Sequence, residues 1–254
     1  MIRLVACDLD GTLLYPDGQL PAGIFDVIRR LREKGVRFAA ASGRQYDNLY
    51  RLFAPEAEHM DFLCENGAVI VAGGKQTASF FPRNTAEQII RDIEGAGMLL
   101  LLSTPAFSVL RLDAPRTYAD DILYRLQNAV ALAADPALYA GQCVKLSGFR
   151  EEGVEGLAPP LQAKWGSALH CDIAGHRWLD FTLTNKGDGI AALSRALQIP
   201  LSDIAAFGDQ FNDEAMLDTV GRPYIMAHAP APLLGKGYTV CRRVMDALEA
   251  ILAE

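Results

Sequence analysis

The stretch that decides the fold lies at the start of the chain and reads Ile2-Arg3-Leu4-Val5-Ala6-Cys7-Asp8-Leu9-Asp10-Gly11-Thr12-Leu13. A largely apolar run of this length that stops at a glycine-containing turn is typical of a buried parallel strand. Ligands of open α/β sheets bind at the carboxyl ends of such strands. Two acidic groups held this close are costly unless a cation or a shared proton offsets them. Taken alone, the stretch also fits an Asp-Gly turn with exposed side chains.

Strands and helices alternate after this stretch, which predicts a parallel sheet. The first helix has apolar residues at helical spacing, with Pro21 in its first turn and Gly35 at its end. The hairpin that follows breaks the alternation and predicts an edge of the sheet. The expected elements are a helix at 21–34, a strand at 36–41, a helix at 45–53, a strand at 62–64, and hairpin strands at 68–71 and 77–81.

The pattern changes beyond Pro82 and returns to alternation after Lys186. Between them we expect antiparallel strands with helices on one face, an α+β insert. Its expected helices are 85–96, 118–131 and one ending at 159–165, and its expected strands are 98–102, 107–112, 144–149, 168–173 and 178–183. The alternation then continues with a helix at 189–197, a strand at 204–207, a helix at 212–217, a strand at 224–226, a loop at 230–232 and a helix from 244.

The predicted fold class is therefore α/β, a Rossmann-like parallel-sheet core interrupted by an inserted α+β domain. Residues 1–81 and 184–254 would form the core, and residues 82–183 the insert. The chain crosses twice between the two domains.

Composition excludes several classes of protein. The chain has 254 residues, a net charge of −7 and scattered basic residues, which argues against a nucleic-acid or anionic-membrane surface. Five widely spaced cysteines without a Cys-x-x-Cys pair argue against a zinc or dithiol site, and we expect them reduced and mostly buried. Met1 leads straight into the first strand and no apolar run approaches about 20 residues. These features predict a cytoplasmic protein whose oligomeric state stays open.

Polar residues follow three other predicted strands or open predicted helices. Ser42-Gly43 offers a hydroxyl and backbone N–H groups that suit a phosphate, although Ser42 could equally cap a helix. Lys186 lies at a helix start, where a lysine is usually solvated but opposes the helix dipole. Gly208-Asp209 and Asn212-Asp213 follow the strand at 204–207, where they could also serve only as an N-capping run.

Together the strand ends supply four carboxylates, a hydroxyl and a lysine. Carboxylates gathered at one edge repel one another without a divalent cation, and oxygen ligands favour Mg²⁺. Mg²⁺, a lysine and a hydroxyl are the parts that phosphoryl transfer needs, and a carboxylate can act as its nucleophile. The residues are Asp8, Asp10, Asp209, Asp213, Ser42 and Lys186.

With these motifs the sequence resembles the haloacid dehalogenase (HAD) superfamily, in its Cof-type, sugar-phosphatase-like branch with a C2B cap. The resemblance spans essentially the whole chain, and its motifs fall in the family order. They are Asp8-Leu9-Asp10-Gly11-Thr12, Ser42-Gly43-Arg44, Glu65-Asn66-Gly67-Ala68, Asn185-Lys186-Gly187, and Gly208-Asp209 with Asn212-Asp213-Glu214-Ala215-Met216.

The resemblance implies a role for each motif residue. Asp8 would be the nucleophile, Asp10 the general acid and base, and Ser42, Gly43 and Lys186 the phosphate-binding groups. Asp8, the Asp10 backbone carbonyl and Asp209 would hold Mg²⁺. Asp213 would orient Lys186 or a metal-bound water, with Asn212 supporting the same loop, and the insert would be the cap over the site.

The implied function is a Mg²⁺-dependent phosphatase for small phosphorylated metabolites, sugar phosphates first, acting through an aspartyl-phosphate. Two alternatives are a phosphomutase or phosphotransferase of the same superfamily and a non-enzymatic phosphoacceptor signalling module. The insert of roughly 100 residues and Asp10 argue against the signalling module, because a second Asp can activate water against a phospho-Asp. One departure from the branch is Ala227-His228-Ala229, where His228 fills a turn or contacts the site.

Overall fold

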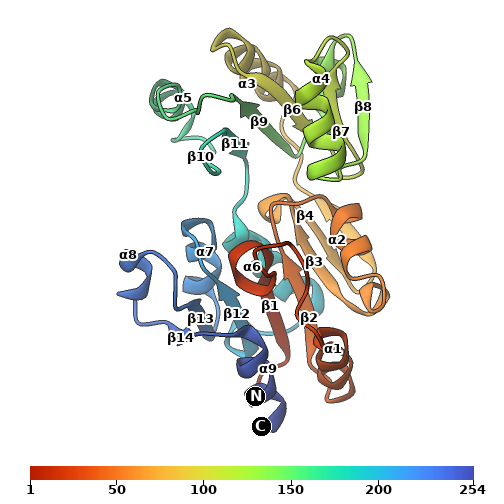
Figure 1. Cartoon of the computed structure of the whole chain (residues 1–254), viewed down its shortest axis with the longest axis vertical. Coiled ribbons are helices and arrows are strands. Elements are labelled where there is room, and N and C mark those ends of the chain that lie inside the picture. The colour runs from red at the N-terminus through yellow and green to blue at the C-terminus, as the bar shows by residue number, and fades with distance from the viewer. The chain divides into compact units, whose positions relative to one another are not determined.

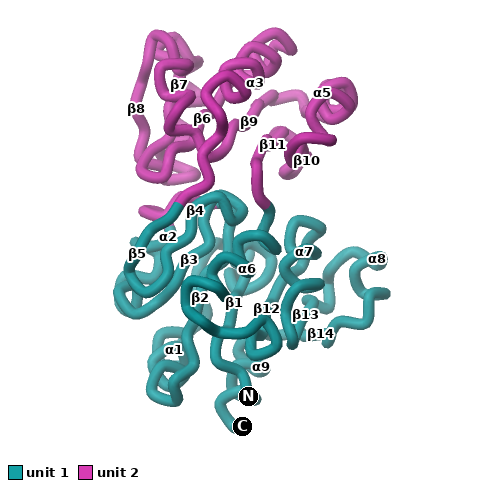
Figure 2. Tube along the Cα trace, turned by 180° about the vertical axis from the view of Figure 1, so that it is seen from behind, with its two compact units in different colours: residues 1–43, 49–77, 185–254 teal, residues 44–48, 78–184 magenta.

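A computed structural model describes residues 1–254, which form two compact units (Figure 2). The first unit comprises Met1–Gly43, Leu49–Thr77 and Asn185–Glu254, and the second comprises Arg44–Asn48 and Ala78–Thr184. No helix in the chain is both long and apolar enough to cross a membrane.

The first unit is built on an eight-stranded sheet in the order β14-β13-β12-β1-β2-β3-β4-β5 (Figure 1). The strands from β14 to β3 run parallel, and β4 returns antiparallel to β3. β5 lies beside β4 at the edge, as the predicted hairpin required, but it spans residues 75–78 and not 77–81. The bounds are β1 Leu4–Asp8, β2 Arg37–Ala41, β3 Asp61–Cys64, β4 Val69–Ala72, β5 Lys75–Ala78, β12 Ile204–Gly208, β13 Arg222–Met226 and β14 Thr239–Cys241.

Helices cover both faces of this sheet because its central strands are apolar on both sides. Leu4 and Ala6 of β1 pack into one core cluster with the helices α6 and α7, while Val5 and Cys7 are buried on the other face. The helices are α1 Ile24–Glu33, α2 Tyr46–Leu52, α6 Lys186–Leu197, α7 Phe211–Thr219, α8 Ala231–Leu234 and α9 Val244–Ala253.

Two local predictions for this unit were wrong in detail, and one strand was missed. The first helix begins at Ile24 and not at residue 21, because Gly23 has a φ of +85° and interrupts the helical backbone. The segment at 230–232 belongs partly to the short helix α8. Strand β14 was not predicted, since three residues carry little periodicity, and only its parallel pairing with β13 defines it.

The second unit is a six-stranded sheet in the order β10-β11-β9-β6-β7-β8. Helices α3 and α5 pack on one face with Leu100 and Leu102, and α4 packs on the other with Leu101. The prediction of helices on one face only was therefore wrong. The bounds are α3 Arg83–Gly95, β6 Leu99–Ser103, β7 Ser108–Arg111, α4 Arg116–Asp120, β8 Val130–Ala133, β9 Lys145–Phe149, α5 Ala158–Trp165, β10 His170–Ile173 and β11 Trp178–Thr182.

The predicted helix at 118–131 was wrong in its second half. Helix α4 continues into a π-type turn at Asp121–Arg125, and Gln127, with a φ of +55°, ends the helical backbone. The chain then forms β8, which pairs parallel to β7 although we expected antiparallel pairing throughout. Apolar residues that suit a helix face here serve a strand, because pairing with β7 outweighs local spacing.

The prediction for the cysteines is confirmed. Cys7, Cys64, Cys143, Cys171 and Cys241 are all buried and all free.

Candidate active site

The register of the parallel sheet places the first and last motifs side by side. Asp8, the last residue of β1, pairs with Ala41 of β2, so Ser42 follows directly beyond it. On the other flank Cys7 pairs with Phe207 of β12, which puts Gly208 beside Asp8 and Asp209 one residue further. The predicted residues therefore gather at one edge because parallel strands share the direction of their carboxyl ends.

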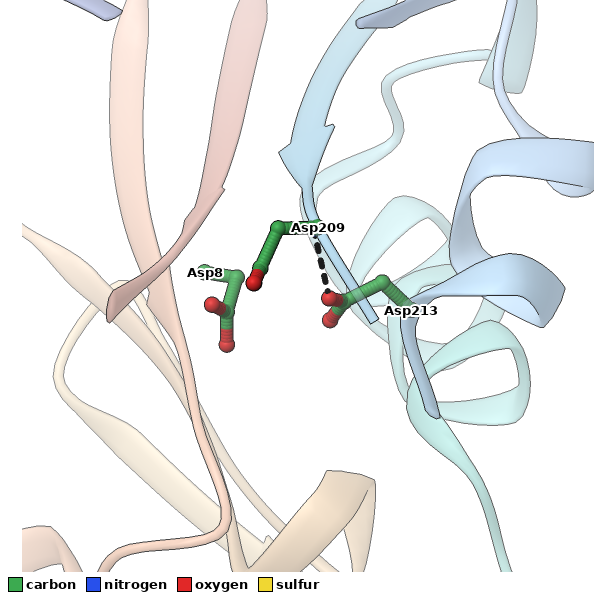
Figure 3. Close-up of side chains that lie close together, drawn as sticks. All are labelled: Asp8, Asp209 and Asp213. Carbon is green, nitrogen blue, oxygen red and sulfur yellow. Dashed lines mark hydrogen bonds between the residues drawn. The ribbon is translucent and has the colours of Figure 1, made fainter. Parts of the chain in front are cut away.

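Three carboxyl groups meet at this edge. Asp8, Asp209 and Asp213 each offer an oxygen, and these oxygens lie within 4.8 Å of one another. Figure 3 shows the three side chains between the ends of β1 and β12 and the first turn of α7. All three are buried, with Asp213 fully excluded from solvent. All-oxygen donors in this number fit a hard divalent cation such as Mg²⁺.

Lys186 joins two of these carboxylates from the other side. Its side chain is 1% exposed, and Nζ donates to Oδ1 of Asp8 and to Oδ1 of Asp213 at 2.5 Å each. A capping box between Asn185 and Asp188 starts α6 at this lysine. Gly187 lets α6 approach α7 closely, since a Cβ there would lie 2.6 Å from the Ala215 carbonyl oxygen. The solvated alternative for Lys186 does not hold.

Asp213 is fixed by the loop that precedes its own helix. Its Oδ2 accepts the backbone N–H groups of Asp209 and Gln210, each at 3.0 Å. Gly208 is required beside it, because a Cβ at that position would lie 2.4 Å from Cβ of Asp213. Asp213 therefore caps the start of α7, as the alternative from the sequence proposed, and its other oxygen also binds Lys186.

The charges in the cluster are not balanced by the protein alone. Burial, and then the neighbouring Asp213 carboxylate, raise the pKa of Asp8 to about 7 despite the opposing effect of Lys186. Burial likewise raises the pKa of Asp209. For Lys186, burial acts to lower the pKa, but Asp213 and Asp8 outweigh it and the pKa is raised. One lysine thus faces three carboxyl groups, and a divalent cation could compensate the remaining negative charge.

A tight π-type turn at Leu9–Leu13 links β1 to the rest of the site. Gly11 has a φ of +88°, and a Cβ there would lie 2.4 Å from Oδ2 of Asp209, so only glycine fits. Thr12 donates from Oγ1 to Oδ1 of Asp209 at 3.0 Å. The side chain of Asp10 is exposed and is not among the three clustered carboxylates.

The predicted phosphate loop is tied to β3. Ser42, which is buried, donates its N–H to the Leu63 carbonyl at 2.9 Å and accepts the N–H of Asn66 at 3.1 Å. Asn66 itself has a φ of +57°, and its Oδ1 is buried without a hydrogen-bond partner. A Cβ on Gly43 would lie 3.1 Å from that oxygen, so Gly43 leaves the space that Asn66 occupies.

Sequence reasoning assigned no role to three residues that contribute to the site. Thr12 and Gln210 hydrogen-bond Asp209, the latter from Nε2 to Oδ2 at 3.0 Å, and Asn66 supports Ser42. Their signal was adjacency, since each directly follows or belongs to a quoted motif. Asn212 is exposed in the first turn of α7. His228 is 60% exposed, and its Nε2 lies 3.7 Å from Oδ2 of Asp209, so it fills a turn and also lies beside the cluster.

Comparisons with known proteins found one matching family model, related sequences and structures of similar fold. A family model described as haloacid dehalogenase-like hydrolase matches residues 5–243. An HMP-PP phosphatase of Cronobacter sakazakii is 28% identical over 93% of this chain and 88% of its own. A 5-amino-6-(5-phospho-D-ribitylamino)uracil phosphatase of Escherichia coli is 23% identical over 99% and 96%. The crystal structure of a haloacid dehalogenase-like hydrolase from Bacteroides thetaiotaomicron superposes with a TM-score of 0.85 at 18% identity, over 99% of this chain and 100% of that one.

Proposed function

The chain belongs to the haloacid dehalogenase-like hydrolase family, and from this premise we propose that it is a Mg²⁺-dependent phosphatase of small phosphorylated metabolites. The observation that carries the proposal is the buried Lys186, which bridges Asp8 and Asp213 beside Asp209. We assign the first unit as the catalytic core and the second as its C2B-type cap. The names of the related phosphatases indicate small phosphorylated substrates, and the substrate named for one of them contains a phosphoribityl group.

Asp8 is the nucleophile in this proposal. Lys186 donates to Oδ1, and we assign Oδ2 as the oxygen that attacks phosphorus. The P–O bond to the leaving group breaks as the new bond forms, which gives an aspartyl-phosphate and an alcohol. Water then attacks the same phosphorus and returns the Asp8 carboxylate with inorganic phosphate.

Asp10 moves the protons. Its exposed side chain follows Asp8 by two residues, on the turn in which Gly11 has a φ of +88°. As a general acid it protonates the leaving oxygen, and as a general base it then takes a proton from the attacking water. The one carboxyl group serves both half-reactions because the first leaves it ionised.

Lys186 and Ser42 hold the phosphoryl group. An ammonium has three N–H donors, and Lys186 spends two on Asp8 and Asp213, so one remains for a phosphate oxygen. The Ser42 hydroxyl and the Gly43 backbone complete the binding loop. Asp213 accepts from Lys186 at Oδ1 and from two backbone N–H groups at Oδ2, and we assign it the role of orienting Lys186.

Mg²⁺ would be held by Asp8, Asp209 and the backbone carbonyl of Asp10. When bound it supplies positive charge that offsets the carboxylates and the phosphoryl oxygens. The donor set fits because Thr12 and Gln210 fix the Asp209 carboxylate in place. We also propose that the protein is cytoplasmic, because five free cysteines suit a reducing compartment.

We expect Mg²⁺ to stabilise the folded protein even without substrate. Ligand at about 100 times its Kd adds about 2.7 kcal/mol, which raises the melting temperature of a chain this size by about 5 °C or more. Thermal melts in chelator and in excess Mg²⁺ measure the shift. Asp209→Asn should remove most of it, whereas Asp218→Asn, which alters an exposed carboxylate, should leave it unchanged. An equal shift in Asp209→Asn would place the cation elsewhere.

Activity is tested with a panel of phosphorylated metabolites. Purified protein with Mg²⁺ should release phosphate from several sugar phosphates, with broad and modest specificity, because the core groups recognise only the phosphoryl group. An Asp8→Asn protein prepared in parallel controls for contaminating phosphatases. If no small metabolite yields more phosphate than this control, the proposed substrate class is wrong.

A further inference from the structure

A cavity lies in the first unit, beside the turn that follows β1 but outside the carboxylate cluster. Its volume is about 480 Å³, and three segments far apart in the sequence enclose it. They are residues 11–16 with Pro21, the end of β13 with His228, and residues 242–245 at the start of α9. None of Asp8, Asp10, Ser42, Lys186 and Asp209 lines it, so it is distinct from the proposed phosphoryl site.

The floor of this cavity is apolar. Leu13, Leu14, Met226 and Val244 line it, and all four are buried. Tyr15, at the rim, leaves 51% of its surface exposed. A cavity of this size with apolar walls falls within the range of small-molecule sites, about 300–1,000 Å³.

The charged residues that line this cavity are two arginines. Arg242 and Arg243 line the cavity with His228, and no acidic residue does, although the chain as a whole carries a charge of −7. The Arg243 side chain is 70% exposed, and its guanidinium lies 3.8 Å from Asp246. Exposed ion pairs of this kind contribute little, so both guanidinium groups stay available to an anion.

The start of α9 adds to this preference. The helix begins at Val244 with Arg243 at its N-cap, and no side chain caps it. A helix N-terminus carries partial positive charge, so two arginines at this position are unfavourable by themselves. An anion bound here would relieve that repulsion and accept N–H groups and guanidinium donors together.

We propose that this cavity binds an amphipathic anion, a carboxylate or phosphate joined to an apolar or aromatic body. The anionic group would lie between Arg242, Arg243 and the start of α9, and the apolar body would pack against the floor. The occupant would also contact Thr12 and His228, both of which lie against Asp209. Two sources share this chemistry, the far end of a phosphorylated substrate and a separate effector molecule.

The binding experiment uses 8-anilinonaphthalene-1-sulfonate, a fluorescent aromatic anion, as the probe. Fluorescence titration of the full chain should show one site. Arg242→Ser combined with Arg243→Ser should weaken the affinity at least tenfold, and Met245→Trp, which fills the cavity without changing charge, should also abolish binding. The control Arg116→Ser with Arg195→Ser removes two exposed arginines elsewhere and should leave affinity within twofold. Affinity that survives both cavity variants, or falls equally in the control, overturns the proposal.

Kinetics of phosphate release in the presence of the probe separate the two sources. A raised KM at constant kcat identifies the cavity as an extension of the substrate site. A changed kcat at constant KM identifies a separate effector site. The binding result stands without any activity, so failure of the proposed function and failure of this site are distinguished.

Discussion

Replacing Asp8 by Asn is expected to lower turnover at least about 10³-fold, a loss of about 4 kcal/mol of transition-state stabilisation. The amide is a poor nucleophile, and the substitution removes one of the two carboxylates that would hold Mg²⁺, the other being Asp209. The fold should persist, because Asn has nearly the same shape in a site already formed by β1. Initial rates on the best substrate, with circular dichroism as the check on folding, measure the effect.

Asp218→Asn is the matched control, since it makes the same chemical change on the exposed face of α7. It should keep turnover close to that of the wild type. A folded Asp8→Asn protein within tenfold of wild-type activity would show that Asp8 does not attack phosphorus.

Replacing Lys186 by Met should lower the free energy of unfolding by about 3–5 kcal/mol in metal-free buffer. The variant leaves the Asp8 and Asp213 carboxylates buried without their shared cation, and an uncompensated buried charge is costly. Denaturant unfolding followed by fluorescence measures the loss. Adding Asp213→Asn to the Lys186→Met protein should recover part of it, because one of the unpaired buried charges is then gone.

Lys236→Met serves as the surface control. Lys236 also binds two carboxylates, Glu214 and Asp218, but at an exposed position. Solvent screens such pairs, so its loss should destabilise the protein far less than the loss of Lys186. Equal destabilisation by the two substitutions would contradict a specific role for burial at Lys186.

Most of the site's location follows from the sequence because parallel strands end at one edge. Once β1, β2 and β12 are recognised as parallel apolar strands, Asp8, Ser42 and Asp209 are expected at the same edge of the sheet, and the observed register brings them close together. The burial of Lys186 did not follow. It depends on the close approach of α6 to α7 at Gly187, a tertiary contact that no local pattern contains.

The largest misassigned segment is the second half of the helix predicted at 118–131, where a tertiary contact outweighs local spacing. The left-handed backbone at Gln127 ends the helix, and pairing with β7 makes Val130–Ala133 a strand. The cavity beside α9 escaped sequence reasoning for a related reason. Residues 11–16 and 242–245 come together only when the sheet is complete, and no pattern in either segment predicts contact with the other.

The central claim is that the phosphoryl group of the substrate is transferred to Asp8, and one measurement tests it directly. The Asp10→Ala protein retains the nucleophile but loses the base for the second step, so with p-nitrophenyl phosphate it should accumulate the aspartyl-phosphate. Acid quenching and mass spectrometry of the digested protein locate the added phosphate. We predict that it lies on the peptide containing position 8, at Asp8, and only after incubation with substrate. Phosphate on Asp209, Asp213 or any other residue would contradict the account.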